Sequence, residues 1–364
     1  MTIEERISDI EEEIRSTSYN KATQHHIGKL KAKLAQLKED VIKRKSSGKK
    51  GAGFSVKKSG DATIVLVGFP SVGKSTLLNQ LTDAGSRVAE YEFTTLNVTP
   101  GMMVYEGVRI QVLDIPGIIT GASTGKGRGK EVLSIVRNSD LILIILEVKN
   151  LMCLESIERE LYDVGIRLNQ NPPKVRVTKT DRGGIKVSST TSLSIDKKMI
   201  RGVLNVYGIH NAQVTIHEDI NVDQLIDVVM KNRVYLPSIT VLNKVDLVDD
   251  KNLGEIRSII KKDILQISAE KNLNLDKLRK EIFRKLRLIR IYTKRQGQKI
   301  YSSKPLIMGE GSTVRDVCGK LHREIREKFR YAILSGKSAK FDSQVVGLNH
   351  VLEDKDVLSI VTER

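Results

Sequence analysis

Residues 68–76 contain a complete G-x-x-x-x-G-K-[ST] pattern. This pattern predicts a loop whose backbone N–H groups hold the phosphates of a nucleoside triphosphate. In such a loop the ammonium group of Lys74 reaches the outer phosphates, and the hydroxyl of Ser75 binds Mg²⁺. We therefore expect nucleotide contacts from these residues: Gly68, Pro70, Ser71, Val72, Gly73, Lys74, Ser75 and Thr76.

The segments on either side of this loop supply the context that such a site requires. Residues 62–67 form a short β-branched run, which predicts a buried strand. Residues 75–81 read as the first turns of a helix. Because the N–H groups of a helix N-terminus attract anions, the order of strand, loop and helix favours a phosphate site over a chance glycine-rich turn.

A second motif, D-x-x-G, begins at Asp114 and ends at Gly117. It follows an alternating run at 108–113, so Asp114 is expected at the carboxyl end of a strand, where open α/β sheets bind ligands. An aspartate there can hold Mg²⁺ through water. The N–H of Gly117 can approach a γ-phosphate closely because glycine has no Cβ. We expect Lys74 and Gly117 to act in catalysis.

A third motif, N-K-x-D, follows the apolar run 239–242 and so also falls at a strand end. The carboxylate of Asp246 can accept hydrogen bonds from the ring N–H and the exocyclic amine of guanine. Asn243 is expected to support the purine edge, and the stem of Lys244 to cover the ring. Adenine does not offer this pair of donors, and a site built for specific hydrogen bonds rejects analogues that lack them.

Ser268 and Ala269 follow a strand-like run at 263–267, where a backbone N–H can meet the guanine carbonyl. This pair of residues alone carries little information. All four motifs in order, each after a plausible strand, predict a guanine nucleotide site.

Together these motifs resemble those of the developmentally regulated GTP-binding (DRG) family of the Obg superfamily, in its archaeal form. Two segments that are not general to GTPases carry much of the resemblance, namely Tyr-Glu-Phe-Thr-Thr-Leu at 91–96 and the glycine-rich run at 121–129. The segments 114–119 and 347–356 add to it, and the latter resembles part of a TGS domain. The resemblance spans nearly the whole chain.

The resemblance implies roles that the residues alone do not. Residues 91–96 would form switch I, in which Thr95 reaches Mg²⁺ and the γ-phosphate, with Thr94 as the alternative. The run 121–129 would form switch II, whose permissive backbone suits a segment that orders around the γ-phosphate. The metal ligands are then Ser75, Thr95 and Asp114. The family also implies a small partner protein that stabilises or stimulates the GTPase.

The residue after D-x-x-G is Ile118, whereas Ras-like enzymes place a glutamine there to orient water. An apolar side chain cannot hold water, so intrinsic GTP hydrolysis is expected to be slow. A monovalent cation such as K⁺, a partner residue, or a polar group such as Arg128 could replace the glutamine. Cation-activated relatives often carry Asn at the position of Ser71, which leaves potassium dependence open.

The predicted fold class is α/β: a P-loop GTPase domain with an N-terminal helical segment, an inserted small α+β module and a C-terminal β-grasp (TGS-like) domain. We expect an N-terminal helical basic region and linker at 1–60 and a GTPase domain at 61–164 and 237–288. The inserted module is expected at 165–236 and the TGS-like domain at 289–364. The insertion is inferred from the long distance between Asp114 and Asn243, and the resemblance implies a fold similar to a ribosomal protein.

Several local patterns refine this plan. Residues 2–46 have helical spacing, and weak helix formers at 16–20 predict a break into two helices. In the insertion, Gly183-Gly184 separates two alternating runs, at 175–178 and 185–188, which predict a β-hairpin. Residues 313–316 have a capping-box pattern at the start of a helix.

The chain is strongly basic, with a net charge of +17 over 364 residues and a pI near 9.7. Residues 21–60 hold twelve basic and two acidic side chains, and 290–364 hold fifteen and nine. Such charge predicts nucleic acid as the partner before any membrane. No apolar run approaches the roughly 20 residues of a membrane span, and the N-terminus lacks a signal-peptide pattern. With two isolated cysteines, we expect a cytoplasmic protein in a reducing compartment.

The leading hypothesis is a GTP-binding and GTP-hydrolysing molecular switch that acts on RNA or ribosomes. The alternative is an RNA-binding adaptor whose nucleotide site is mainly structural. A relic need not retain Lys74, Ser75, Asp114 and Asp246 together, which favours the switch. ATP-driven remodelling is disfavoured by Asn243 and Asp246.

Overall fold

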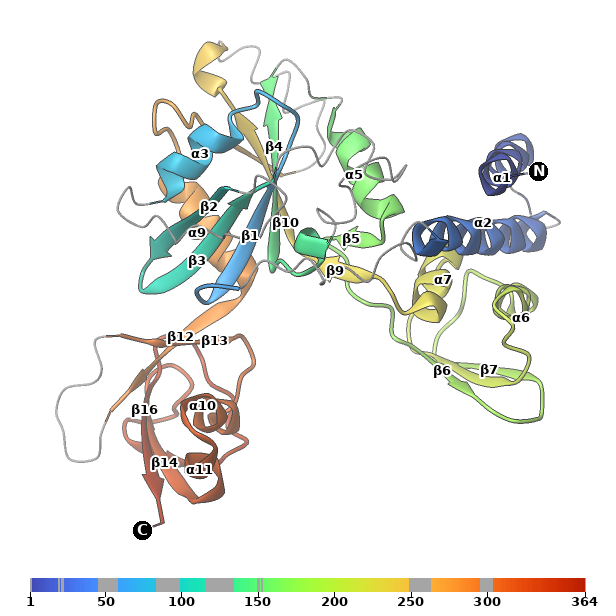
Figure 1. Cartoon of the computed structure of the whole chain (residues 1–364). Coiled ribbons are helices and arrows are strands. Elements are labelled where there is room, and N and C mark those ends of the chain that lie inside the picture. The colour runs from blue at the N-terminus through green and yellow to red at the C-terminus, as the bar shows by residue number, and fades with distance from the viewer. Residues whose placement is uncertain are drawn as a thin grey trace. The chain divides into compact units, whose positions relative to one another are not determined.

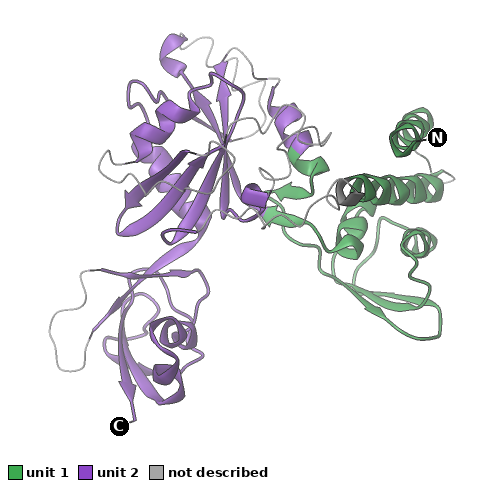
Figure 2. Ribbon diagram, viewed as in Figure 1, with its two compact units in different colours: residues 1–53, 123–127, 161–235 green, residues 54–122, 128–160, 236–364 purple. Residues whose placement is uncertain are grey.

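A computed structural model describes residues 2–18, 20, 23–44, 58–82, 99–115, 134–148, 151, 153–248, 263–294 and 304–363. The chain divides into two compact units (Figure 2). Unit 1 comprises residues 1–53, 123–127 and 161–235, and unit 2 comprises 54–122, 128–160 and 236–364. None of the helices formed by the described residues is long and apolar enough to cross a membrane.

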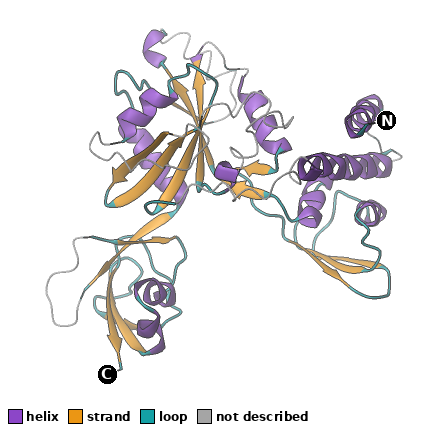
Figure 3. Cartoon of the chain, viewed as in Figure 1, coloured by secondary structure: helices purple, strands orange, loops and turns teal. Residues whose placement is uncertain are grey.

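Unit 2 contains a six-stranded sheet in the order β11-β10-β4-β1-β3-β2 (Figures 1 and 3). Its strands are β1 (Ala62–Val67), β2 (Thr99–Tyr105), β3 (Val108–Asp114), β4 (Leu141–Glu147), β10 (Ser238–Asn243) and β11 (Ile264–Gln266). Five of them are parallel, and β2 alone runs antiparallel, paired with β3. The carboxyl ends of the parallel strands therefore lie at one edge.

One apolar core covers a face of this sheet. Helices α3 (Lys74–Leu81) and α9 (Leu275–Leu286) contribute leucines and Ile282 to the same cluster as the strand side chains. The strands predicted at 62–67, 108–113 and 239–242 and the helix at 75–81 are confirmed. The central strand β4 was not predicted, although 141–146 is a continuous apolar run of the kind that buried parallel strands show.

The C-terminal part of unit 2 is a second sheet, ordered β13-β12-β16-β14-β15. Its strands are β12 (Leu288–Thr293), β13 (Leu306–Gly309), β14 (Phe329–Ser335), β15 (Gln344–Val346) and β16 (Val357–Thr362), with helices α10 (Val314–Leu321) and α11 (Arg323–Glu327). Residues of α10 pack into its core. The capping-box prediction is confirmed, since Asp316 Oδ2 accepts the backbone N–H of Thr313 at 2.8 Å.

Unit 1 contains the N-terminal helices and the inserted module. The helices are α1 (Ile3–Ser16), α2 (Gln24–Arg44), α6 (Lys197–Val206) and α7 (Val222–Met230), and the strands of its sheet are β6 (Val175–Lys179), β7 (Ile185–Ser189) and β8 (Ala212–Ile216). The predicted break between the first two helices is confirmed. The adjoining elements are α5 (Cys153–Asp163), β5 (Ile166–Leu168) and β9 (Val234–Leu236).

The predicted hairpin between 175–178 and 185–188 is wrong. Strands β6 and β7 do not pair with each other, because β8 lies between them, antiparallel to β6 and parallel to β7. The side chain of Val214 in β8 is fully buried, whereas the outer strands are only half buried. The most apolar strand, β8, takes the central position. The Gly183-Gly184 turn, from which the hairpin was predicted, carries no information about this order.

Helix α2 belongs to the core of the inserted module. Ala32 is fully buried in the same cluster as Met199 and Val203 of α6. The hydroxyl of Tyr207 donates to the carbonyl oxygen of Ala32 at 3.2 Å, and Lys31 pairs with Asp223 of α7 at 2.8 Å. The N-terminal segment and the insertion, far apart in the sequence, therefore share one apolar interior.

A buried ion cluster holds α7 in place. The carboxylate of Asp227 accepts from both Arg167, at 2.7 and 2.8 Å, and Arg233, at 2.9 Å. The side chains of Asp227 and Arg167 are 4% and 3% exposed. Arg167 also lies over the ring of Tyr162, 3.6 Å from its centroid.

We expect the substitution Asp227→Asn to destabilise unit 1 by about 3–5 kcal/mol, because it leaves the buried guanidinium group of Arg167 and the partly buried one of Arg233 without a counter-charge. Hydrogen-exchange mass spectrometry on peptides of α6 and α7 measures this loss. Asp223→Asn on the same helix is the control. Its ion pair with Lys31 is more than a third exposed, so the cost should stay below about 1 kcal/mol. Equal effects of the two substitutions would contradict the role of the buried cluster.

Candidate nucleotide-binding site

The predicted site residues converge at the carboxyl edge of the six-stranded sheet. Strand β1 leads into the loop 68–73, β3 ends at Asp114, and β10 ends at Asn243. Ser268 and Ala269 follow β11. Because all these strands are parallel, residues as far apart in the sequence as Gly68 and Ala269 reach the same edge.

The loop 68–73 has a backbone that few residues can adopt. Gly73 has φ +92°, and a Cβ there would lie 2.4 Å from Nδ2 of Asn243. A Cβ on Gly68 would lie 2.6 Å from the carbonyl oxygen of Ile145. Ser71 also has a positive φ, of 65°. The second glycine of the motif is thus required both by its dihedral angle and by the approach of Asn243.

Lys74 begins α3 and folds over the loop. Its Nζ donates to the carbonyl oxygens of Gly68 at 3.0 Å and Phe69 at 2.8 Å. Burial lowers the pKa of Lys74 from its ordinary value, and the charge of Asp114 partly offsets this effect. A partly desolvated ammonium group gains more from an anionic ligand than one in water does.

Ser75 and Asp114 form a direct pair. The hydroxyl of Ser75 donates to Oδ2 of Asp114 at 2.7 Å. Oδ1 of Asp114 is buried and has no hydrogen-bond partner among the described residues. A buried carboxylate oxygen without a partner, beside a hydroxyl, is an oxygen donor set that suits a hard cation such as Mg²⁺.

Asn243 connects the phosphate loop to the segment after β11. Its side chain is buried, Nδ2 donates to the carbonyl oxygen of Val72 at 2.9 Å, and Oδ1 accepts the N–H of Ala269 at 2.9 Å. The sequence predicts that a backbone N–H of the Ser268–Ala269 pair meets the guanine carbonyl, and the structure shows that the N–H of Ala269 is already used by Asn243. In the structure, Asn243 holds the phosphate loop and the turn after β11 in position relative to each other.

Lys244 makes a second connection to the phosphate loop. With φ 62°, it directs Nζ to the carbonyl oxygen of Ser71 at 2.8 Å and to Glu147 Oε1 at 3.2 Å. Glu147, at the carboxyl end of β4, was missed by the sequence reasoning. The signal that could have found it is an acidic residue that directly follows a continuous apolar run.

The remaining predicted residues differ in what they offer a ligand. The carboxylate of Asp246 is exposed and makes no hydrogen bond with the described residues. Ser268 is buried, and its hydroxyl accepts the N–H of Lys271 at 3.1 Å, so this side chain shapes the turn. Pro70 and Thr76 are exposed, and Val72 packs into the core.

Two predicted site residues, Thr95 and Gly117, lie outside the described residues. The same holds for Thr94, Ile118 and Arg128, and for the predicted switch segments 91–96 and 121–129. Their roles remain predictions from the sequence.

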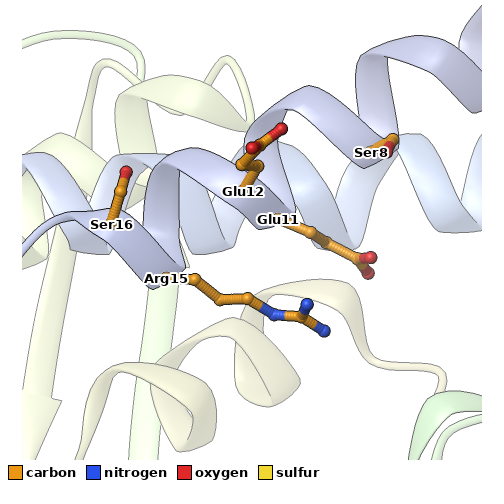
Figure 4. A pocket seen from close by; sticks show the side chains of 5 residues that line it. All are labelled: Ser8, Glu11, Glu12, Arg15 and Ser16. Atoms are coloured by element: carbon orange, nitrogen blue, oxygen red, sulfur yellow. The ribbon is translucent and has the colours of Figure 1, made fainter.

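Surface hollows in unit 1 do not overlap this site. One, of about 460 Å³, lies along α1 and is lined by Ser8, Glu11, Glu12, Arg15 and Ser16 (Figure 4). All of its lining residues come from one helix, and Glu12 and Arg15 point in different directions. The hollow is therefore a shallow helix surface. None of its lining residues is a predicted nucleotide ligand.

Comparison with known proteins identifies the family. Residues 63–179 match the 50S ribosome-binding GTPase model, 182–288 match the C-terminal region of that domain, and 289–362 match the TGS domain. The chain is 55% identical over 368 residues to an uncharacterized GTP-binding protein of Methanocaldococcus jannaschii, covering 100% of this chain and 94% of that protein. It is 46% identical over 361 residues to developmentally-regulated GTP-binding protein 1 of Xenopus laevis, covering 98% of each.

The chain belongs to the family of developmentally regulated GTP-binding proteins. Human developmentally-regulated GTP-binding protein 2 is 43% identical over 364 residues, covering 99% of this chain and 100% of that protein. The solved structure of the Schizosaccharomyces pombe YchF GTPase is 16% identical, covers 84% of this chain and 99% of that chain, and has a TM-score of 0.48. The predicted resemblance and fold class are confirmed: this DRG-family chain has a P-loop GTPase domain and a TGS domain, and GTP is its ligand.

We expect Gly73→Ala to weaken GDP binding at least tenfold. An L-residue at a left-handed φ costs about 1–2 kcal/mol, and the new Cβ would also displace Asn243. Titration calorimetry with Mg²⁺ and GDP measures the affinity. Gly208→Ala is the matched control, since Gly208 has φ +69° but a Cβ there meets no atom within 4 Å and lies in unit 1. Unchanged affinity in Gly73→Ala would show that the loop does not need this backbone.

Proposed function

We propose that this chain is a Mg²⁺-dependent GTPase that acts as a molecular switch on ribosomes or RNA. The observation that carries the GTPase part is the Ser75–Asp114 pair with its buried, unpartnered carboxylate oxygen. Ser75 and Asp114, with Thr95 from the segment outside the described residues, are the proposed metal ligands. A metal bound there would neutralise charge on the phosphates, and Lys74 would contact the outer phosphates.

Base selection is assigned to Asp246. Its carboxylate is exposed and makes no bond with the described residues, so it remains available for two guanine N–H donors. Asn243 and Lys244 keep this residue in a constant place relative to the phosphate loop through their bonds to Val72 and Ser71. In this proposal Asp246 contacts the base, whereas Asn243 and Lys244 position Asp246 without contacting the base.

The ribosome or RNA part of the proposal is supported by charge and by family. The matched domain model is that of a 50S ribosome-binding GTPase, and the chain carries a net charge of +17. Basic side chains bind phosphate backbones without reading sequence. A small regulatory partner protein and a cytoplasmic location complete the proposal. The basic charge equally supports the alternative, an RNA-binding adaptor with a mainly structural nucleotide site. The Ser75–Asp114 pair supports the GTPase and not the adaptor.

Intrinsic turnover is expected to be slow because Ile118 cannot orient water. Steady-state phosphate release by the purified chain should lie far below about 100 per second, the upper range for kinases. The assay is run in K⁺ and in Na⁺ at equal ionic strength, with Ser71→Asn as the variant that introduces the residue of cation-activated relatives. Turnover near that upper range without a partner would contradict the proposal. Faster turnover in K⁺ than in Na⁺ would show that the cation takes the role of the glutamine that Ile118 replaces.

Ribosome association is expected to depend on the nucleotide. The chain is sedimented with ribosomes in GDP and in a non-hydrolysable GTP analogue, across a salt series. We expect several-fold more binding in one nucleotide state, and we expect Lys74→Ala to abolish that difference. If Lys74→Ala leaves both GTP turnover and ribosome association unchanged, the switch model fails and the adaptor remains.

A further inference from the structure

The sheet of unit 1 has one covered face and one open face. The side chains of Val175, Val177, Ile185 and Val187 point to the apolar cluster, together with Ala212, Val214 and Ile216. Helices α2, α6 and α7 contribute to that same cluster, and Figure 1 shows α6 and α7 on one side of β6 and β7. Because side chains alternate along a strand, the intervening residues must lie on the other face.

The open face is composed of cations, hydroxyls and an amide. The strand register places Arg176 beside Thr215, and Thr215 beside Ser188. It also places Thr178 beside Gln213, and Gln213 beside Lys186. These six side chains are exposed, except for the half-buried Thr215. The face therefore carries two rows of three polar side chains across the strands. Arg176 lies at one end of the first row, and Lys186 lies at the opposite end of the second.

Acidic and aromatic side chains are absent from these six positions. The nearest acidic residues in the sequence lie beyond the strand ends, Asp181 in the β6–β7 connection and Glu218 after β8. Glu218 accepts the backbone N–H of Lys174 at 2.8 Å. Two more exposed cations adjoin β6, Lys174 directly before it and Arg182 in the β6–β7 connection. The electrostatic character of the face is cationic.

We propose that this open face binds the sugar-phosphate backbone of double-helical RNA. Arg and Lys neutralise phosphates, and the hydroxyl and amide groups between them can exchange hydrogen bonds with 2′-hydroxyls, which line the wide minor groove of A-form RNA. Single strands are usually held by stacking on aromatic side chains, which this face lacks. The inference rests on the proposed action on RNA or ribosomes and assigns it a surface.

The spacing of the two cations suits separate phosphates. Arg176 and Lys186 lie on the two outer strands and two residues apart along the sheet, which corresponds to about 12 Å between their Cα atoms by standard strand geometry. Two charges so far apart contact different phosphates rather than one. Each then contributes its own counterion release, so the two effects on salt dependence should add.

The test compares two double variants of the full chain. Arg176→Gln with Lys186→Gln removes the cations of the open face, and Lys197→Gln with Lys198→Gln removes two exposed cations at the start of α6, on the covered side. Binding to a fluorescein-labelled RNA duplex of about 16 base pairs, the length that a double-stranded RNA-binding domain spans, is measured by anisotropy from 50 to 200 mM KCl. GTP turnover is recorded on the same samples.

We expect the open-face variant to bind the RNA duplex about tenfold more weakly at 100 mM KCl, with the slope of log affinity against log salt reduced by about 2. The control variant should change affinity less than about threefold, and turnover should be unchanged in both. Substituting Thr178→Val and Ser188→Ala should reduce the preference for RNA over a DNA duplex of the same sequence.

Other outcomes overturn the inference. If both double variants bind as the wild type does, or lose affinity equally, the open face is not the RNA site, while the proposed switch stands. If polyglutamate competes as well as the RNA duplex at equal charge, the face is a general anion surface. If the wild type binds neither RNA nor ribosomes in any nucleotide state, the proposed action on RNA fails together with this inference.

Discussion

The side-chain amide of Asn243 is the contact on which the rest of the nucleotide site depends. It is buried and uses both of its polar atoms, one on the phosphate loop and one on the turn after β11. A buried amide that lost either partner would leave a polar group unsatisfied, at a cost of about 1–3 kcal/mol. The two segments are therefore held at a constant separation, and Asp246 lies three residues beyond this anchor. Gly73 accommodates the same amide, since any side chain there would occupy its place.

This arrangement is possible because the sheet is parallel around β1. Strands β3, β4 and β10 lie on either side of β1 in the order of the sheet, so their carboxyl ends deliver Asp114, Glu147 and Asn243 to one edge. The apolar core beneath consists of the strand side chains together with α3 and α9. The described loops that follow β1, β10 and β11 lie beyond this core at the carboxyl edge, where open α/β sheets bind ligands.

Unit 1 is built on a different principle. Its small three-stranded sheet is covered on one face only, and α2, from the N-terminal region, completes that cover. A sheet this small has a limited interior, so the added helix and the buried Arg167–Asp227–Arg233 cluster both contribute to defining one structure. The uncovered face is left with polar side chains because apolar ones would remain in water.

The sequence by itself determined the chemistry and the local elements. The phosphate-loop pattern predicted the strand, loop and helix at 62–81. This succeeded because the glycines, the lysine and the hydroxyl residue that such a loop needs all lie within a few positions of one another in the sequence. The break between α1 and α2, and the capping box at Thr313, followed from intrinsic preferences in the same way. The family resemblance was likewise readable from short segments.

Only the tertiary structure decided which distant segments meet. The order β6-β8-β7 replaced the expected hairpin because burial of Val214, rather than the intervening glycines, selects the central strand. The contacts of Asn243 and Lys244 with the phosphate loop, of Lys244 with Glu147, and of α2 with the inserted module join residues more than 90 positions apart. Such contacts are chosen by competition among all the apolar and polar surfaces of the folded chain. A sequence pattern within one segment indicates which secondary structure that segment prefers. It does not indicate which distant segment it will contact.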